Sequence, residues 1–593
     1  ERTAASREAI GAAIVGGGAP ADLGYPRRRG ASGSERHLGL RVEDLQVQAM
    51  IDRTLIARTA LLVAVVVLAV RAAAWAELEA SPLSDWYLWM ETDEHAALVA
   101  AERVASGNLL DRPSFRPWFS WQASFGSRSD WEAVYPKDVF YQAPLYVYAV
   151  AAVSRLSDST AMVIRLSQLL LAVAASAALA AAGTSLMLRS RRPGWVAMIA
   201  GLGAGLFHGL YGPLVYLDGF LFRDGPLVNL SALLLALPLL SPSSPRTRSV
   251  VALGLLGGLT TLLKQTVLPL ALAAGAVAVL RESSRELRLR KAAAFLVAFA
   301  FALSPLVARN LVVGAPAFAF DTRPVVCFPW ANARGADGSV DPSPLLMEVL
   351  LEARGSTFRA ATLSLATWRD EPAGLVVLLG RKLASAFNGA EIPDNANFTF
   401  FRERLWWLGV LPVFACLLGT GVIGLVLAAR RRLYRPGEAA LVAVAALVPL
   451  AACLLVSTTT RYRTAAVAPL ALGTGLLLSL LVEALRHRRV AELIVPLSGA
   501  GILSLQTLLP SPVPCPKSRW ADSLVAATLA ESRISPEAGA VEIRRYLQEG
   551  LDDPRRAAGM VAMNRWLAGD RSMTRVAVRG VAPVERRFDA RRR

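Results

Sequence analysis

Cysteine and histidine are scarce in this chain, and their scarcity excludes several kinds of structure. Four cysteines in 593 residues are too few for a disulfide scaffold. Cys416 and Cys453 lie in apolar runs, whereas Cys327 and Cys515 lie in loops and could pair, although we favour free thiols. Four histidines leave no His/Cys cluster with the spacing of a metal site. No internal repeat is visible, which weakens a transporter built from two inverted halves.

Acidic residues are also few relative to basic ones. Lysine and arginine number 64 against 46 acidic residues, which gives a net charge of +18. Such an excess could indicate nucleic acid as a partner. The arginine clusters instead fall between apolar runs, in 189–192, 246–248, 281–291, 430–432 and 486–489. We interpret them as cytoplasmic loops facing anionic headgroups, and we expect no nucleic-acid partner.

Apolar residues are abundant and arranged in long runs. They make up 54% of the chain, and the mean hydropathy is +0.42. Runs near 20 residues predict an all-α polytopic membrane protein with about 11 transmembrane helices. The expected spans are 54–76, 160–188, 194–216, 225–241, 249–263, 266–280, 291–308, 405–429, 438–457, 464–484 and 491–510. Every basic loop then falls on the cytoplasmic side, provided that 142–156 lies at the surface or inserts only halfway.

These spans predict three regions. Residues 1–53 form a disordered cytoplasmic tail, 54–510 form the transmembrane domain, and 511–593 form an external helical tail. Within the transmembrane domain, 77–159 is a first external loop with interfacial helices, and 310–404 is a second external loop. The second loop is too long for a simple connector.

Four basic residues lie at the external ends of apolar runs. They are Lys264, Arg309, Arg461 and Arg463. Charges there are costly unless they are solvated, paired or functional. Each could be an interfacial anchor whose side chain reaches water. The other interpretation is a cation that binds a phosphate.

Four acidic residues share the same predicted face. Asp93 and Glu94 follow the first span, and Asp218 and Asp224 flank a short turn. Thr92 or Asp93 could simply cap the helix expected to end at Gly107, with the acids favouring its dipole. That role is compatible with catalysis. Asp218 and Asp224 could belong to a solvated turn, or could shape a site.

Six segments follow the order of motifs in a known superfamily. They are Asp93-Glu94 with Ala101 and Gly107, Tyr141-Gln142-Ala143-Pro144-Leu145-Tyr146, Asp218 to Asp224, Gly258-Leu259 to Lys264, Arg309-Asn310 with Gly314, and Arg461-Tyr462-Arg463. Through these segments, over about 54–480, the chain resembles the GT-C glycosyltransferases. It is most similar to the bacterial protein-mannosyltransferase-like family and the lipid A aminoarabinose transferases. Ala143 stands where relatives often carry lysine, and Ala96 and Ala97 stand where some carry arginine or tyrosine.

The resemblance implies a GT-C fold and a sugar donor on polyprenyl phosphate, transferred with inversion to a lipid, glycan or protein hydroxyl. It implies a multi-pass protein of the inner (plasma) membrane with its site on the non-cytoplasmic face. Asp93 is the expected base, with Glu94 as second choice. Further expected roles are donor phosphate binding by Lys264, Arg461, Arg463 and Arg309, site shaping or metal binding by Asp218 and Asp224, and substrate access past Tyr141, Gln142 and Tyr146.

The resemblance leaves some points open. No cofactor is certain, and a divalent cation such as Mg²⁺ or Mn²⁺ is possible. The loop 310–404, with Trp330, Asn332 and 388–397, is expected to cover the acceptor side. The alternatives are a transporter or lipid flippase, a polysaccharide polymerase or ligase, and a non-catalytic scaffold.

Overall fold

The computed structural model describes residues 34–241, 244–489, 491–515, 519–549 and 556–569. The regular structure in these ranges is helical, and they contain no strand. The all-α class predicted from the apolar runs is therefore confirmed. Residues 1–33, the larger part of the expected cytoplasmic tail, lie outside the described residues.

The chain divides into two units, 1–53 and 54–593. In the first unit the described residues belong to helix α2 (Ser34–Ala80), where we expected disorder. Residues 40–53 contain neither glycine nor proline and are rich in leucine, glutamine and other helix formers, which explains the difference.

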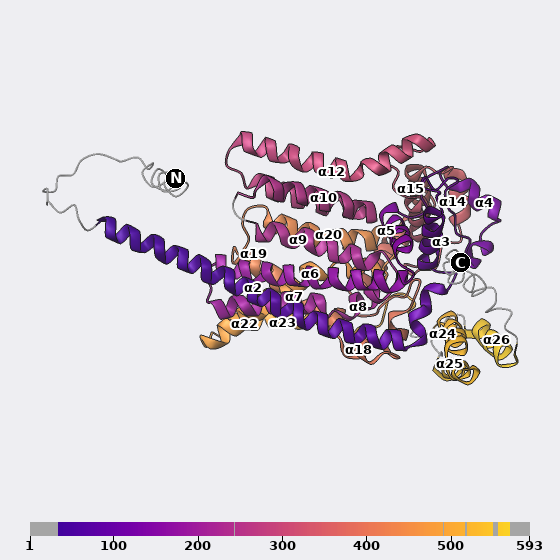
Figure 1. Cartoon of the computed structure of the whole chain (residues 1–593). Helices are drawn as coiled ribbons and strands as arrows, with labels where there is room; N and C mark the ends of the chain where they lie inside the picture. Colours follow the sequence, from indigo (N-terminus) through magenta and orange to yellow (C-terminus); the bar gives the residue numbers. More distant parts are fainter. Residues whose placement is uncertain (1–33, 242–243, 490, 516–518, 550–555, 570–593) are drawn as a thin grey trace. The chain divides into compact units, whose positions relative to one another are not determined.

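The apolar helices of the second unit run side by side as a bundle (Figure 1). Helix α6 contacts α7 and α9, α22 contacts α7 and α19, and α10 contacts α12. After the last part of α2, the bundle consists of α6 (Thr160–Arg189), α7 (Gly194–Gly209), α8 (Gly212–Gly219), α9 (Asp224–Leu240), α10 (Thr247–Leu263), α11 (Leu268–Leu280), α12 (Arg285–Val313), α19 (Phe414–Arg430), α20 (Glu438–Leu455), α22 (Val467–Arg486) and α23 (Ala491–Gln506).

Several of these helices could cross a membrane. Five are long and apolar enough, namely Met50–Ala80, Thr160–Arg189, Arg285–Val313, Glu438–Leu455 and Val467–Arg486, and α7 with α8 could be a sixth span bent by 46°. The other expected spans correspond to shorter apolar helices. The chain is thus a helical protein with several potential membrane spans, and the number of about 11 stays a prediction.

The expected span 405–429 is interrupted. Helix α18 (Trp406–Val410) ends before Leu411, and α19 begins only at Phe414. Pro412 lies in the gap, has no backbone N–H to donate and cannot continue a helix. Its carbonyl accepts a hydrogen bond of 2.8 Å from the backbone nitrogen of Gly212, so the break in this segment meets the break between α7 and α8.

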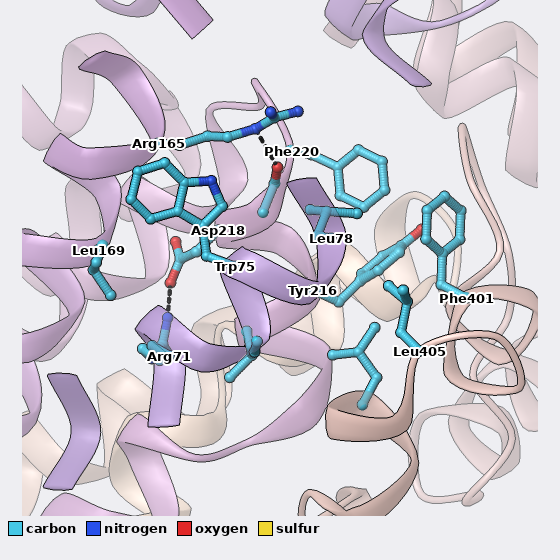
Figure 2. A pocket seen from close by; sticks show the side chains of 14 residues that line it. Arg71, Trp75, Leu78, Arg165, Leu169, Tyr216, Asp218, Phe220, Phe401 and Leu405 are labelled. Atoms are coloured by element: carbon cyan, nitrogen blue, oxygen red, sulfur yellow. Dashed lines mark hydrogen bonds and ion pairs between the residues drawn. The ribbon is translucent and has the colours of Figure 1, made fainter. Parts of the chain in front are cut away.

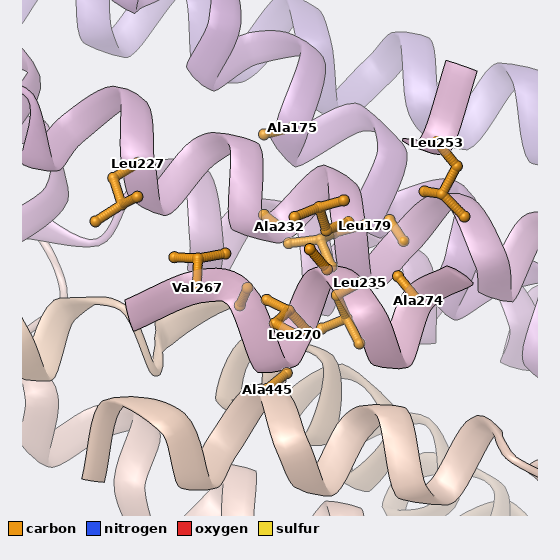
Figure 3. Close-up of a cluster of buried hydrophobic side chains, with 14 of the residues drawn as sticks. Ala175, Leu179, Leu227, Ala232, Leu235, Leu253, Val267, Leu270, Ala274 and Ala445 are labelled. Atoms are coloured by element: carbon orange, nitrogen blue, oxygen red, sulfur yellow. The ribbon is translucent and has the colours of Figure 1, made fainter. Parts of the chain in front are cut away.

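Small side chains allow the bundle helices to pack closely. Figure 3 shows Ala175, Ala232, Ala274 and Ala445, which belong to α6, α9, α11 and α20, among leucines of α6, α9, α10 and α11. Such residues let helix backbones approach each other in lipid. Large apolar side chains point outward instead, such as Phe301 on α12, which is 70% exposed. An outer surface of this kind suits hydrocarbon rather than water.

Short helices gather at one end of the bundle (Figure 1), which we call the site end. They belong to the two expected loops and to the breaks between spans. They are η1 (Pro82–Leu88), α3 (Asp93–Ala105), η2 (Ser120–Ser124), α4 (Arg128–Val134), α5 (Pro144–Leu156), η3 (Gln265–Val267), α13 (Arg323–Asn332), α14 (Leu346–Ala353), α15 (Thr357–Ala366), α16 (Pro372–Ala386), α17 (Phe398–Arg402), α18 and α21 (Thr460–Thr464).

The described part of 511–593 forms three helices with their own apolar core. They are α24 (Trp520–Arg533), α25 (Pro536–Glu549) and α26 (Arg556–Leu567). Helix α24 packs on η1, and Arg404 pairs with Glu542 of α25 at 2.7 Å. These contacts attach the C-terminal helices to the site end.

Candidate functional site

Asp93 and Glu94 lie in the first turn of α3, directly after its N-cap. Thr92 is the cap, because its hydroxyl accepts the backbone N–H of His95 at 3.2 Å. The acids favour the positive end of the helix dipole, as the simpler interpretation of this motif expects. Since Thr92 supplies the cap, the Asp93 carboxylate is available for other contacts.

The Asp93 carboxylate is buried and surrounded by donors. Arg323 pairs with its Oδ1 at 2.5 Å, and Arg461 donates to Oδ2 at 3.1 Å. Gln142 donates to Oδ1 at 3.1 Å and Asn395 to Oδ2 at 3.2 Å. Burial alone would raise the pKa of Asp93, but the two guanidinium groups hold it well below its usual range. Asp93 is therefore an anion at neutral pH.

Glu94 is buried as well, but in different surroundings. Its Oε2 has no hydrogen-bond partner among the described residues. Burial raises the pKa of Glu94 to about 8, and the charges of Arg165 and Arg461 offset this only in part. Glu94 is therefore mostly protonated at pH 7. It also does not line the cavity next to Asp93.

Arg461 is the centre of the charged group. Besides Asp93, its guanidinium pairs with Asp394 and lies 3.8 Å from Asp224. It also lies over the ring of Phe222, 4.5 Å from the ring centre. Arg461 follows α20 and Asp224 begins α9, so one side chain joins the first loop, the second loop and the bundle.

Lys264 reaches the same group from the end of α10. Its Nζ donates to Asp224 Oδ1 at 3.0 Å and lies 4.1 Å from the centre of the Tyr462 ring. Burial lowers the pKa of Lys264 to about 8, although Asp224 opposes the shift. Asp224 therefore offsets only part of the cost of burying the Lys264 ammonium. Contacts through Asp224 and Arg461 connect Lys264 to Asp93.

Two cavities meet at Arg461 and Tyr462. The first, the aromatic cavity, has a volume of about 160 Å³, and its lining includes Asp93, Trp121, Tyr135, Tyr141, Arg323 and Trp330. The second, the apolar cavity, has a volume of about 30 Å³ and is lined mainly by apolar side chains of α9, α11 and α20, with Asp224 and Lys264 beside them. The charged group therefore separates a polar, aromatic space from an apolar one.

Two expected site residues, Arg463 and Tyr146, contact the structure around the cavities. Arg463 pairs with Glu391 at 2.6 Å and donates to the carbonyl of Ala390 at 2.9 Å, so it holds the segment 388–397. Tyr146 contacts Gln168 at 3.4 Å inside the bundle. Neither residue lines the two cavities.

Arg309 is also placed away from the Asp93 carboxylate. It donates to the carbonyl of Leu110 at 3.0 Å and 2.8 Å and to the carbonyl of Asp138, and it lies over the ring of Phe140. These are backbone contacts with the first loop. Arg309 therefore anchors this loop, and few of its N–H groups remain to bind a phosphate.

Asp218 lies in a different cavity from Asp224. Figure 2 shows Asp218 paired with Arg71 of α2. The cavity that both residues line has a volume of about 40 Å³, and Asn229 donates to Asp218 at 3.2 Å. The two acids therefore do not form the shared site that we expected. Within the described part of the chain, no three His, Cys, Asp or Glu side chains are close enough to hold a metal.

Some residues that complete the site have no distinguishing pattern in the sequence. Arg323 lies inside the second loop, between the apolar segments 315–320 and 324–331, which are too short to predict a span and therefore do not mark it as a charge at a span end. Arg223 is fully buried, and its Nε and Nη1 have no hydrogen-bond partner among the described residues. Asp394 and Asn395 lie in 388–397, which we expected only as part of a cover over the site. Cys327 lines the aromatic cavity, whereas Cys515 donates to the carbonyl of Glu391 at 3.4 Å.

Comparison with known proteins finds no similarity to this chain. No family model matches it, and neither a curated protein nor a solved structure matches it. A function can therefore be inferred only from the geometry of the site.

Proposed function

We propose that the chain is a membrane glycosyltransferase that moves a sugar from a polyprenyl-phosphate donor to an acceptor hydroxyl with inversion. One observation carries the proposal. An ionised carboxylate, Asp93, and two cations, Lys264 and Arg461, meet where the aromatic cavity adjoins the apolar cavity. A donor with an apolar tail, a phosphate and a sugar needs these three environments in this order.

The two cavities suit the two ends of such a donor. The apolar cavity adjoins α20, one of the helices able to cross a membrane, so an isoprenoid tail can reach it from lipid. The phosphate would lie between Lys264 and Arg461, where charged donors bind it strongly. The buried nitrogens of Arg223, which have no hydrogen-bond partner in the described ranges, are further donors near this position. The sugar and the acceptor would occupy the aromatic cavity, whose tyrosine and tryptophan rings have both apolar faces and polar groups.

The reaction breaks one bond and forms one. The acceptor oxygen attacks the anomeric carbon from the face opposite the phosphate, the bond from that carbon to the phosphate oxygen breaks, and polyprenyl phosphate leaves as an anion. Lys264 and Arg461 stabilise the charge that develops on it. Asp93 orients the acceptor hydroxyl and accepts its proton. Because a bound phosphate competes with Asp93 for Arg461, donor binding raises the low pKa of Asp93 and makes it a better base.

A turnover assay tests this proposal. Purified protein is incubated with radiolabelled polyprenyl-phosphate sugars, and release of polyprenyl phosphate is measured with candidate lipid, glycan and protein acceptors. Asp93→Asn should lower the rate by about 10²- to 10⁴-fold, the range of general base catalysis. Glu132→Gln removes an exposed carboxylate from the same loop and should have no effect. An unchanged rate in Asp93→Asn would exclude Asp93 as the base.

We further propose the GT-C fold, about 11 spans, and a plasma-membrane location with the site end on the non-cytoplasmic side. The basic loops at the other end support this orientation. A membrane-impermeant thiol reagent should label Glu132→Cys at the site end in intact cells and should not label Arg431→Cys. The reverse pattern would contradict the orientation.

A lipid flippase or transporter is the second candidate, favoured by the bend of 46° between α7 and α8. Broken helices of this kind occur in transporters. The charged residues of the site, however, lie at helix ends rather than at mid-span. Movement of a labelled polyprenyl-phosphate sugar across vesicles without turnover would favour this candidate.

A further inference from the structure

A second charged cluster lies at the end of the bundle opposite to the Asp93 site. Glu438 begins α20, and Arg461 follows the other end of that helix. The Glu438 side chain is completely buried. It accepts hydrogen bonds from Arg189 at 3.0 Å and 3.2 Å, from Arg281, and from the backbone N–H of Arg435 at 2.9 Å. We call these four residues the Glu438 cluster.

The Glu438 cluster has more positive than negative charge. Three arginines surround one carboxylate, and the guanidinium groups of two of them, Arg189 and Arg281, donate to it. The Nε atoms of Arg189 and Arg281 and the Nη1 of Arg435 are buried without a hydrogen-bond partner among the described residues. The hydroxyl of Tyr434 is in the same state. Buried donors without acceptors are costly, so the cluster has unused capacity for an anion.

The pKa shifts of two of these arginines agree with a capacity to bind an anion. Burial lowers the pKa of Arg435, and the neighbouring charge of Arg189 lowers it further. Burial likewise lowers the pKa of Arg281, and Glu438 offsets this only in part. One carboxylate therefore does not fully stabilise the cations of Arg281 and Arg435, and a second anion would.

The position of the cluster indicates where that anion comes from. Arg189 ends α6 and Glu438 begins α20, and both helices are long and apolar enough to cross a membrane. The cluster is thus placed where a span ends and lipid headgroups begin. Exposed arginines at 430–432 lie on the adjoining loop and would attract an anionic surface.

We propose that the Glu438 cluster binds the phosphate group of an anionic lipid in the leaflet opposite to the Asp93 site. Arg189 and Arg281, held by Glu438, fix the ends of α6 and α11 around the phosphate. Arg435 supplies a third guanidinium, which donates no hydrogen bond to any described residue. This lipid site is independent of the proposed sugar transfer.

Binding of labelled phosphatidylglycerol to the full-length protein in phosphatidylcholine nanodiscs tests the proposal. Arg435→Ala removes one guanidinium and leaves the contacts of Arg189 and Arg281 with Glu438 in place. The matched control is Arg432→Ala, which removes the same charge from an exposed position on the same loop. We expect affinity to fall about 10- to 100-fold in Arg435→Ala, as for a lost charge-assisted hydrogen bond, and about fivefold or less in Arg432→Ala, as for general surface attraction.

Two further arms separate the possible outcomes. Glu438→Gln removes the competing carboxylate and should tighten binding, whereas a purely structural cluster would bind no lipid in either form. Inorganic phosphate at millimolar concentration should compete only weakly if the lipid is the source. Equal losses in Arg435→Ala and Arg432→Ala would overturn the proposal. So would complete competition by inorganic phosphate.

Discussion

Replacing Lys264 with arginine should remove an alkaline limit on the binding of a polyprenyl phosphate. Lys264 is buried beside Asp224, and burial lowers the pKa of its ammonium to about 8. A lysine with a lowered pKa loses its charge at a lower pH than usual. Above pH 8, therefore, a growing fraction of the protein lacks the cation that faces the phosphate.

The size of the effect follows from the pKa. A lipid phosphate is mainly dianionic above about pH 6, so its own charge is constant in the range of interest. If only the protein with charged Lys264 binds tightly, the affinity falls about tenfold per pH unit between pH 8 and about 10. Arginine keeps its charge throughout this range, so Lys264→Arg should show a flat profile.

Equilibrium binding of radiolabelled polyprenyl phosphate, measured from pH 6.5 to 10, gives the two profiles. Lys137→Arg changes an exposed lysine in the first loop and should keep the wild-type profile. An equal loss of affinity above pH 8 in wild type and in Lys264→Arg would exclude Lys264 as the titrating group. Constant affinity in both proteins would exclude it as well.

Three further outcomes are expected. Arg323→Ala should raise the pKa of Asp93, which Arg323 now lowers, and should move the acid limb of the pH–rate profile towards neutral pH; Arg323→Lys should move it less. Arg309→Ala should destabilise the protein by about 3 kcal/mol through its lost backbone contacts, seen as a lower Tm, with the affinity for polyprenyl phosphate unchanged. Lys382 is buried against Asn332 and backbone carbonyls, and burial lowers its pKa to about 7. The unfolded chain thus binds a proton at this lysine that the native protein does not, so stability gains up to about 1.4 kcal/mol per pH unit from pH 7 to about 10; Lys382→Met should weaken this dependence of Tm on pH.

The sequence predicted the face of the bundle on which the charged residues meet, because alternation of spans and basic loops determines which span ends lie together. Lys264 and Arg461 are separated by almost 200 positions in the sequence, yet both contact Asp224 at the site end. Asp93 and Gln142 were predicted from the first loop and do contact each other at 3.1 Å. A charged residue next to an apolar run is energetically costly, so such a residue can be recognised in the sequence as a candidate site residue.

The sequence could not predict partners within the long loops. Arg323 and Asn395 contact Asp93 from the second loop, where polar residues are common and carry no positional signal. It could not separate anchors from ligands either, since Arg309 follows the same pattern as Arg461 but binds backbone carbonyls. Asp218 pairs with Arg71 because α2 packs against α8, a contact that local pattern does not determine.

A cryo-EM structure of the protein in nanodiscs with bound polyprenyl phosphate would show where the donor phosphate binds. We expect phosphate density between Lys264 and Arg461, with the isoprenoid chain leaving through the apolar cavity beside α20. Phosphate density elsewhere, with Asp93 and Arg461 still paired as in the free protein, would contradict this expectation.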